Sequence, residues 1–595
     1  MTNELSMGQR LTMLNVLTNP ICVQHRRARM RWLPTMTWAL ITVTIVTFIV
    51  VLVFLSLTNR GIEDPVNAAK SALVPLIIVQ GVLLMGAGTS AVATGIARER
   101  DRRLLDYHRM TPMSPASKII GYLFGLPSRE YFLFLLTLPF VAWAVWRAGV
   151  PLLKVAHFYT AFFSSVWLYH MTGLMAGMVS PKAWQSSFIS LGTVAGLYLV
   201  LPQFARLGLS FFDFLTVRPT FYGMVAQELE LANPGEPSGW ITQRMLLVNQ
   251  YESVPFFGLQ LNPTLFSLVV QVFALTAMYH VVRRKWVDAA WHPFSKRFAV
   301  WFVAGMTVLL GGSLWPLLHN VSAHEALINR FYDGSPAVLM GLLVGLFFVV
   351  SAVAMLMSIS IITPTRNTVR RGLRRARKVG RPRLPLSWDA ASSLPATMLM
   401  LGTALGGYAL VVTAIRDSAV YVWRPGMGEW LLTLAVLGVA VTLAFQGMHE
   451  RFGQRAVILG LFVLWVVPVM VSIVLLAAFD AWRPGMYIGA LCPAAAGGMS
   501  LSFLIDTAGD AVARDRAILT GTIADHDARQ VIRLTVAFYV FLAVFAQVLR
   551  ADARRRWREA ESMALGTGTS GESAASFTSP VSTSRPVSPL RPAAD

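Results

Sequence analysis

Charged residues are scarce in this chain of 595 residues: Asp, Glu, Lys and Arg together make up 14% of it, against about 25% in ordinary globular domains. Hydrophobic residues account for 55%, and the mean hydropathy is +0.57. This composition excludes an ordinary soluble domain. It predicts an all-α polytopic membrane protein, because the apolar runs are long enough to cross a bilayer as helices.

Cysteine is scarce as well. The two cysteines, Cys22 and Cys492, are too few and too far apart in sequence to predict a disulfide framework. About 35 mostly polar and basic residues precede the first apolar run, so no cleaved signal peptide is expected.

Acidic residues are missing from the interiors of the apolar runs, with only Glu429 at an edge. Coupling to protons or sodium generally needs ionisable groups inside the membrane. His170 is the one central ionisable residue, with His157 and His280 near the ends of their runs. A single histidine in a span is expected to be packed and hydrogen bonded, so a proton relay is the weaker interpretation.

A phosphate-binding loop of the G-x-x-x-x-G-K-[ST] type is also missing, since none of the seven lysines follows a glycine. If the protein is driven by ATP, the ATPase must be another polypeptide. We therefore expect no cofactor in this chain, with ATP and Mg²⁺ bound by the partner.

The apolar runs form two sets of six with similar spacing, since corresponding starts differ by 263 to 273 residues. The first set lies near 36–57, 72–96, 131–146, 156–179, 186–205 and 264–282, and the second near 299–318, 336–362, 395–415, 429–448, 456–477 and 533–549. This spacing predicts a duplication, with about 12 transmembrane helices arranged as two parallel six-helix repeats. The substrate path would then lie between the halves.

The runs divide the chain into five parts: a cytosolic amphipathic lead-in (1–35), a first six-span module (36–282), a cytosolic linker (283–298), a second six-span module (299–549) and a cytosolic basic tail (550–595). Each module has its largest cytosolic loop after its second span (98–129 and 363–394) and its longest outer segment before its sixth span (206–263 and 478–532). The tail from about 562 onward is expected to be disordered, because its composition cannot bury enough apolar surface.

Basic residues test this topology. Of the 51 basic residues, 36 fall in segments assigned to the cytosol, as the positive-inside rule requires. Both termini are therefore expected in the cytosol. The rule also explains the net charge of +21 without nucleic acid as a partner.

The turn between the second and third runs is the most charged part of the first module. Arg98–Arg103 are all charged, Leu104 and Leu105 follow, and Pro112 and Pro115 end any helix. Because an Arg or Asp at the bilayer centre costs roughly 2.5–3.5 kcal/mol, this stretch is expected on the membrane surface, where it offers charge to a cytoplasmic partner.

The same stretch resembles the cytosolic loop of bacterial ABC-2-type permeases, in which a charged E-R turn leads into leucines, a T-P-x-S turn and an I-x-G close. The corresponding residues are Glu99, Arg100, Leu104, Leu105, Thr111, Pro112, Ser114, Ile119 or Ile120, and Gly121. Residues 19–27 also resemble the N-P-x-x-x-x-E-x-R entry helix of some such permeases, with His25 in place of the glutamate.

The resemblance implies the membrane subunit of an ATP-driven exporter in the bacterial cytoplasmic (inner) membrane, here with two six-span modules fused. It implies an amphipathic, lipid-linked or drug-like substrate, and a separate ATPase, expected as a dimer, docked on the first loop. The residues it assigns to this coupling are Arg98, Glu99, Arg100, Leu104, Leu105, Thr111, Pro112 and Ser114. The alternative is an ordinary amphipathic loop at the membrane surface.

The corresponding loop of the second half is strongly basic, with no acidic residue before Asp389. Its Val369, Leu373 and Ala376 share one helical face. Two interpretations stay open: a second docking element, or a helix that binds anionic lipids at about 1 kcal/mol per Lys or Arg. The residues concerned are Arg370, Arg371, Arg374 and Arg375.

Two other classes remain, a twelve-span secondary transporter and a membrane-embedded enzyme. An enzyme would draw on outer residues able to hold a metal, although interleaved arginines there are typical of a solvated helix surface. These residues are Asp506, Asp510, Asp515, Asp525, His526 and Asp527. No metal is expected, and self-association is left open.

Two local features complete the predictions. The segment 486–505 is apolar enough to span, but Pro493, Gly497 and Gly498 favour a re-entrant or outer-surface segment. The G-x-x-x-G pairs in two spans predict close helix packing rather than a pathway. These pairs are Gly173 with Gly177 and Gly341 with Gly345.

Overall fold

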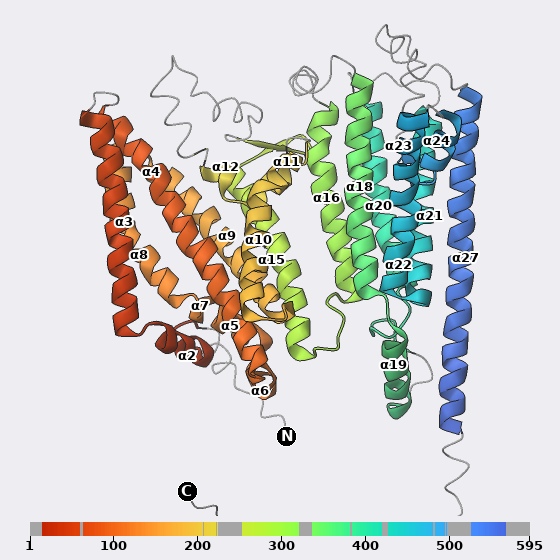
Figure 1. Cartoon of the computed structure of the whole chain (residues 1–595), viewed down its shortest axis with the longest axis horizontal. Helices are drawn as coiled ribbons and strands as arrows, with labels where there is room; N and C mark the ends of the chain where they lie inside the picture. The colour runs from red at the N-terminus through yellow and green to blue at the C-terminus, as the bar shows by residue number, and fades with distance from the viewer. Residues whose placement is uncertain are drawn as a thin grey trace, which may run out of the picture.

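The structure is a computed structural model, shown in Figure 1. The residues it describes are 15–59, 64–205, 208–221, 223, 253–319, 336–380, 384–418, 427–479, 482–493, 495–496 and 525–566. These residues form a bundle of long helices with short helices at both ends and one two-stranded hairpin (Figure 1).

The first half contains long helices joined by short ones. The long ones are α3 (Trp32–Asn59), α4 (Pro65–Gly81), α5 (Thr89–Asp101), α8 (Ser128–Ala148), α9 (Leu152–Val179), α10 (Ala183–Leu199) and α15 (Pro263–Val287). The short ones are α2 (Pro20–Arg29), the π-helical turn η1 (Val82–Gly88), α6 (Leu104–Met110), α7 (Pro115–Gly125), α11 (Leu201–Ala205), η2 (Ser210–Leu215) and α12 (Arg218–Phe221). Strands β1 (Val254–Phe256) and β2 (Leu259–Leu261) pair antiparallel.

The second half also contains long helices and shorter elements. Its long helices are α16 (Lys296–His319), α18 (Pro336–Ile362), α20 (Leu394–Arg416), α21 (Met427–Phe452) and α27 (Asp525–Gly566). Its shorter elements are α19 (Arg366–Lys378), α22 (Gln454–Leu461), the π-helical turn η4 (Phe462–Val466), α23 (Val467–Phe479) and α24 (Trp482–Gly489).

Three helices begin with the same local chemistry, an Asx residue followed by proline. Asn19, Asp64 and Asn262 each accept hydrogen bonds from backbone N–H groups in the first turn of α2, α4 and α15. The proline that follows has no N–H to satisfy and is already set to a helical φ. These starts are therefore determined locally.

Eleven helices among the described residues are long and apolar enough to cross a membrane, which confirms an all-α polytopic membrane protein. They are Trp32–Asn59, Pro65–Asp101, Ser128–Ala148, Ala183–Ala205, Pro263–Val287, Lys296–His319, Leu343–Ile362, Leu394–Arg416, Met427–Phe452, Val457–Phe479 and Gln530–Glu559. The twelfth expected run, 156–179, forms helix α9, which is not among the eleven. Twelve spans and the parallel repeat therefore remain predictions.

Helix α9 is largely enclosed by the protein. It packs against α5, α10 and α15, and its polar residues Ser164, Ser165 and His170 are buried with its apolar ones. A helix surrounded by other helices meets little lipid, so it can carry polar side chains that find partners inside the bundle.

Several expected boundaries were wrong. The run 131–146 extends to a helix of 21 residues, and the run 533–549 lies in α27, which has 42 residues and continues to Gly566. The residues just after 550 are thus helical. Of the segment 486–505, the described part holds the end of the eight-residue helix α24, which is too short to span, and helical residues at 493 and 495–496. Residues 494 and 497–505 lie outside the described residues.

The two halves meet along α15 and α16 (Figure 1). Phe273 of α15 lies with its ring centroid 5.0 Å from Trp301 and 5.6 Å from Phe302 of α16. Farther along, the hairpin reaches over α16, where the N–H of Phe257 donates to the carbonyl of Gly312 at 3.2 Å. Because apolar rings fill this seam, a path between the halves requires them to separate.

Close approach of α9 to α5 depends on two glycines one turn apart. A Cβ at Gly173 would lie 2.6 Å from the carbonyl oxygen of Thr89, and one at Gly177 would lie 2.6 Å from that of Ala93. The predicted packing role is confirmed for this pair. In the second pair, no atom lies within 4 Å of the position that a Cβ of Gly345 would take, so no close helix contact is seen there. The surroundings of Gly341 lie outside the described part of the structure.

Replacing Gly177 by alanine should lower the free energy of unfolding by about 1–3 kcal/mol, because backbone atoms cannot move aside for the new methyl group. The measurement is the thermal midpoint of the purified protein in detergent. The matched control is Gly196→Ala, where nothing lies within 4 Å. A midpoint for G177A equal to that for G196A would contradict the packing role.

Candidate functional site

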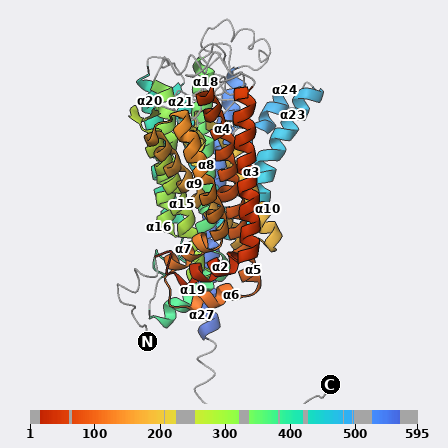
Figure 2. The same ribbon diagram turned by 90° about the vertical axis from the view of Figure 1, so that its left-hand side faces the viewer.

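Both predicted cytosolic loops lie at the same end of the bundle. Helices α2, α6, α7 and α19 and the C-terminal part of α27 are found there in both views (Figures 1 and 2), and we call this the basic end. The β1–β2 hairpin, α12 and α24 lie at the opposite end (Figure 1). The sequence-based prediction that both loops share a face is therefore met by the structure.

Local chemistry shapes the first loop. Helix α5 ends at Asp101, Arg103 takes a left-handed conformation with φ 58°, and α6 follows. The Thr111 hydroxyl donates to the His108 carbonyl at 2.7 Å, and Ser114 caps α7 by accepting from the Ser117 N–H at 3.1 Å. The T-P-x-S residues thus form the turn that ends α6 and begins α7.

Glu99 lies inside the protein rather than at its surface. It is 8% exposed, its Oε1 lies 3.0 Å from His25 Nε2, and its Oε2 accepts a hydrogen bond from the Tyr122 hydroxyl. Tyr122 also packs against Trp286 of α15, with ring centroids 5.3 Å apart. The expectation that Glu99 offers charge to a partner is wrong, because its carboxylate joins α2, α5 and α7.

The titratable groups around Glu99 respond to burial. Burial, together with the Glu99 carboxylate, holds the pKa of Tyr122 well above its ordinary value, so the phenol stays protonated and donates a hydrogen bond to the carboxylate. Burial also lowers the pKa of His108 and of Lys118. The residues of this cluster therefore converge on one buried carboxylate, that of Glu99, which is met by His25 and the Tyr122 hydroxyl.

Arg100 also turns inward. Its Nη1 donates to the carbonyl of Gly177 at 3.2 Å, and its Nη2 donates to the carbonyl of Pro181 at 3.2 Å and to Asp101 at 2.8 Å. These carbonyls belong to the end of α9 and the turn after it, where a cation is favoured. Arg100 therefore fastens the loop to α9.

The exposed face of the first loop is carried by α6. Leu104, Tyr107 and Met110 are 39%, 62% and 79% exposed, and their spacing of three places them on one side of the helix. Leu105, in contrast, is 5% exposed and belongs to a buried cluster. Sequence reasoning named Leu104 and Leu105 and missed Tyr107 and Met110, although the spacing from Leu104 could have found them.

The remaining predicted coupling residues lie around this face. Arg98, Pro112 and Ser114 are exposed, and Thr111 is half-buried. The structure therefore brings together an apolar strip on α6 and a polar margin, with Glu99, Arg100 and Leu105 supporting them from within.

Other carboxylates at the basic end are paired with distant segments. Glu130, 2% exposed, accepts from Arg29 of α2 at 2.6 Å. In the second half, Glu450, 4% exposed, pairs with Arg554 of α27. A further pair joins the halves, since Arg284 of α15 donates to both oxygens of Asp389 at 2.7 and 2.9 Å.

Helix α19 uses its apolar face against its own chain. Val369, Gly372 and Ala376 are buried, and the Cα of Gly372 faces the side chain of Ala390 so closely that no Cβ would fit. The helix stands along the bundle axis beside α27 (Figure 1). Helix α19 therefore does not lie flat on the membrane with its apolar face in the lipid, which is one way in which a basic amphipathic helix binds anionic lipids.

The four arginines singled out in this loop point to different places. Arg371 and Arg374 are exposed and Arg370 is half-buried, while Arg375 stacks over the ring of Trp388 at 5.3 Å. A basic surface with this arrangement is open to water along the length of α19.

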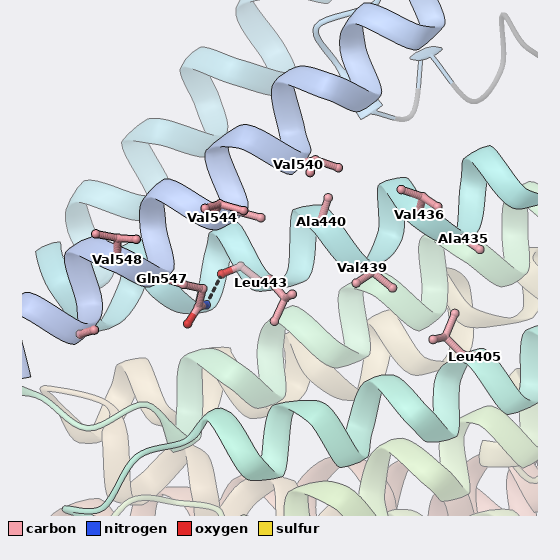
Figure 3. A pocket seen from close by; sticks show the side chains of 12 residues that line it. Leu405, Ala435, Val436, Val439, Ala440, Leu443, Val540, Val544, Gln547 and Val548 are labelled. Atoms are coloured by element: carbon pink, nitrogen blue, oxygen red, sulfur yellow. Dashed lines mark hydrogen bonds between the residues drawn. The ribbon is translucent and has the colours of Figure 1, made fainter.

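A lateral groove lies between α20, α21 and α27, where α21 forms its floor (Figure 3). Its volume is about 690 Å³. Eleven of its twelve lining residues are apolar, and the exception is Gln547, which donates to the Leu443 carbonyl at 2.8 Å. The lining residues are Leu405, Ala435, Val436, Val439, Ala440, Leu443, Val540, Ala543, Val544, Gln547, Val548 and Ala551.

His170 is a packed interior residue. Its Nε2 lies 3.1 Å from the Leu84 carbonyl, which can only accept, so Nδ1 accepts from the Tyr131 hydroxyl at 3.3 Å. The accepting carbonyl belongs to the π-helical turn η1. With both ring nitrogens engaged, His170 fits the structural interpretation better than the proton relay.

The acidic residues and the histidine that an enzyme would use lie outside the part of the chain whose side chains are described. Asp506, Asp510 and Asp515 lie outside the described residues, as do the side chains of 525–529. Within the part of the chain that the structure describes, no group of three or more His, Cys, Asp or Glu residues could hold a metal ion.

The fold defines an all-α polytopic membrane protein with a structured basic end. No family model, curated protein or solved structure matches the chain.

Replacing Glu99 by alanine should lower the free energy of unfolding by about 2 kcal/mol, because the buried Tyr122 hydroxyl and His25 lose their acceptor. The thermal midpoint in detergent measures this loss. Asp106→Ala, which removes a carboxylate that is 64% exposed, serves as the control and should change the free energy by no more than about 0.5 kcal/mol. Equal midpoints for the two variants would show that Glu99 does not hold the loop.

Proposed function

We propose that this chain is the membrane-spanning subunit of an ATP-driven exporter of the ABC-2 type, with two six-span modules in one polypeptide. A separate ATPase, expected as a dimer, docks at the basic end and moves an amphipathic, lipid-linked or drug-like substrate outward. The direction and the substrate class follow from the sequence resemblance.

The observation that carries this proposal is the exposed apolar strip of α6. A two-turn helix at the aqueous end of a bundle gains nothing from presenting Tyr107 and Met110 to water. Aromatic residues and methionine are enriched where proteins bind one another. The strip is also rigidly mounted, because Glu99 and Arg100 tie the ends of the loop to α2, α7 and α9.

The rigid mounting matters for coupling. A force applied to α6 is transmitted to α5 directly, to α2 through His25, and to α15 through the contact of Tyr122 with Trp286. Helix α15 in turn packs on α16 and is joined by Arg284 to the loop of the second half. An ATPase on α6 could thus separate the two halves along their common seam.

The placement of charge supports energy input from the basic end. Among the described residues, the buried carboxylates of the long helices, Glu99, Glu130 and Glu450, lie within three residues of the ends of α5, α8 and α21. Glu130 and Glu450 are paired with arginines there, and Glu99 is met by His25 and the Tyr122 hydroxyl. A carrier coupled to protons or sodium generally needs such groups near the middle of the membrane, so a secondary transporter is the second candidate.

The duplication is supported by the loops. In each half the segment after the second predicted span folds into helices at the basic end, α6 and α7 in the first and α19 in the second (Figure 1). The two are not alike in surface: α6 carries an apolar strip and α19 carries arginines. We therefore assign the main ATPase contact to α6, with the basic surface of α19 as a second contact.

The variant Tyr107→Ala/Met110→Ala should reduce the ATPase that co-purifies with the full chain at least about tenfold, because truncating the central anchor residues of an interface costs about 1 kcal/mol or more each. The measurement is ATP hydrolysis by the chain purified from the cells that make it, with the associated subunit identified by mass spectrometry. The control, Trp146→Ala/Leu153→Ala, removes two exposed apolar side chains at the opposite end.

Failure would take one of two forms. Purification without any ATPase would refute the proposal, and an ATPase retained by the α6 variant would refute its site. Transport that stops on addition of a protonophore and persists after ATP depletion would instead establish the secondary transporter.

A further inference from the structure

The lateral groove has the length of one membrane leaflet. On α27 its lining runs from Val540 to Ala551, which at about 1.5 Å per residue is roughly 17 Å. The hydrocarbon core of a bilayer is about 30 Å thick. The length of the groove is therefore close to half the thickness of the hydrocarbon core, which is the depth that one extended acyl chain spans.

The groove runs toward the aqueous boundary at the basic end. The apolar run of α27 ends at Leu549, and basic residues begin at Arg550. Trp557, a residue type favoured at the membrane interface, lies two turns beyond the groove. On α27 the groove thus extends from the apolar run to the headgroup region at the basic end.

Two exposed arginines continue the face of α27 that lines the groove. Val544, Val548, Ala551, Arg555 and Arg558 follow one another at intervals of four, three, four and three residues, so they share one side of the helix. The Arg555 side chain is 81% exposed, and Arg558 is exposed as well. The guanidinium groups therefore follow the groove one and two turns beyond its end.

These arginines retain donors for a ligand. Arg555 uses its Nε to donate to Glu559 at 2.9 Å, but a guanidinium has five N–H donors. The neighbouring Arg550 and Arg554 are engaged by Glu450. The charge at the mouth of the groove is complementary to a phosphate that accepts several hydrogen bonds at once.

We propose that the groove between α20, α21 and α27 holds one acyl chain of an anionic phospholipid whose phosphate binds Arg555 and Arg558. The apolar lining selects the chain, and the two guanidinium groups select the negative headgroup. The site does not depend on the transport proposal, since it requires neither an ATPase nor a substrate.

The test is native mass spectrometry of the full chain in detergent, titrated with phosphatidylglycerol and, separately, with phosphatidylcholine of the same acyl chains. We expect the wild type to retain phosphatidylglycerol preferentially. Arg555→Gln/Arg558→Gln should weaken phosphatidylglycerol binding about 30-fold, since each arginine contributes about 1 kcal/mol, and should abolish the preference. Arg556→Gln, on the same turn but on another face of α27 and paired with Asp552, should keep it.

A second pair of variants tests the groove itself. Val544→Trp fills it from a position that is 60% exposed, so the fold is not disturbed, and should reduce retention of both lipids. Val548→Trp fills the groove from a second lining position, which is 61% exposed. Leu534→Trp is the control, because Leu534 is 55% exposed and does not line the groove.

Three results would overturn the proposal. Retention by both groove-filling variants equal to that of L534W would show that the chain lies elsewhere. An undiminished preference in R555Q/R558Q would remove the headgroup site. Loss of a dimer signal in the filled variants without loss of lipid would show that the groove is covered by a second copy of the chain.

Discussion

A carboxylate that is buried away from water needs a cation or a hydrogen-bond donor beside it. At the basic end this requirement determines which segments of the chain lie together. Glu99, Glu130 and Glu450 are almost fully buried, and each is met by a side chain from another element. For Glu130 and Glu450 the partner lies about a hundred residues away in sequence. Such pairs add little net stability over apolar packing, but removing one partner is costly, so they specify which segments meet.

This constraint gives the first loop a fixed surface. With Glu99 and Arg100 engaged inside, the first loop cannot swing as a free charged turn. What it presents to the outside is the other side of α6, with Tyr107 and Met110. The same principle places α19: its apolar face packs on the chain near Ala390, so its arginines face water along the helix. A partner at this end would therefore meet two different, fixed surfaces.

Much of the helical framework was predictable, because long apolar runs can cross a membrane only as helices and because Asn19, Asp64 and Asn262, each followed by proline, set helix starts locally. The candidate site was only partly predictable. The segment was correctly located at the basic end, yet Glu99 was expected to face a partner. Its burial depends on His25 and Tyr122, and no local pattern shows that either would lie beside it.

By itself the sequence determined that the chain is an all-α polytopic membrane protein and which segments are too charged to enter the lipid, since both follow from the free energy of moving side chains out of water. Only the tertiary structure decided which side of each charged segment turns inward. It also decided that α9 can be polar within the bundle, and that α20, α21 and α27 leave a groove. Burial is a property of neighbours, and neighbours distant in the chain are chosen by packing and by the pairing of buried charge.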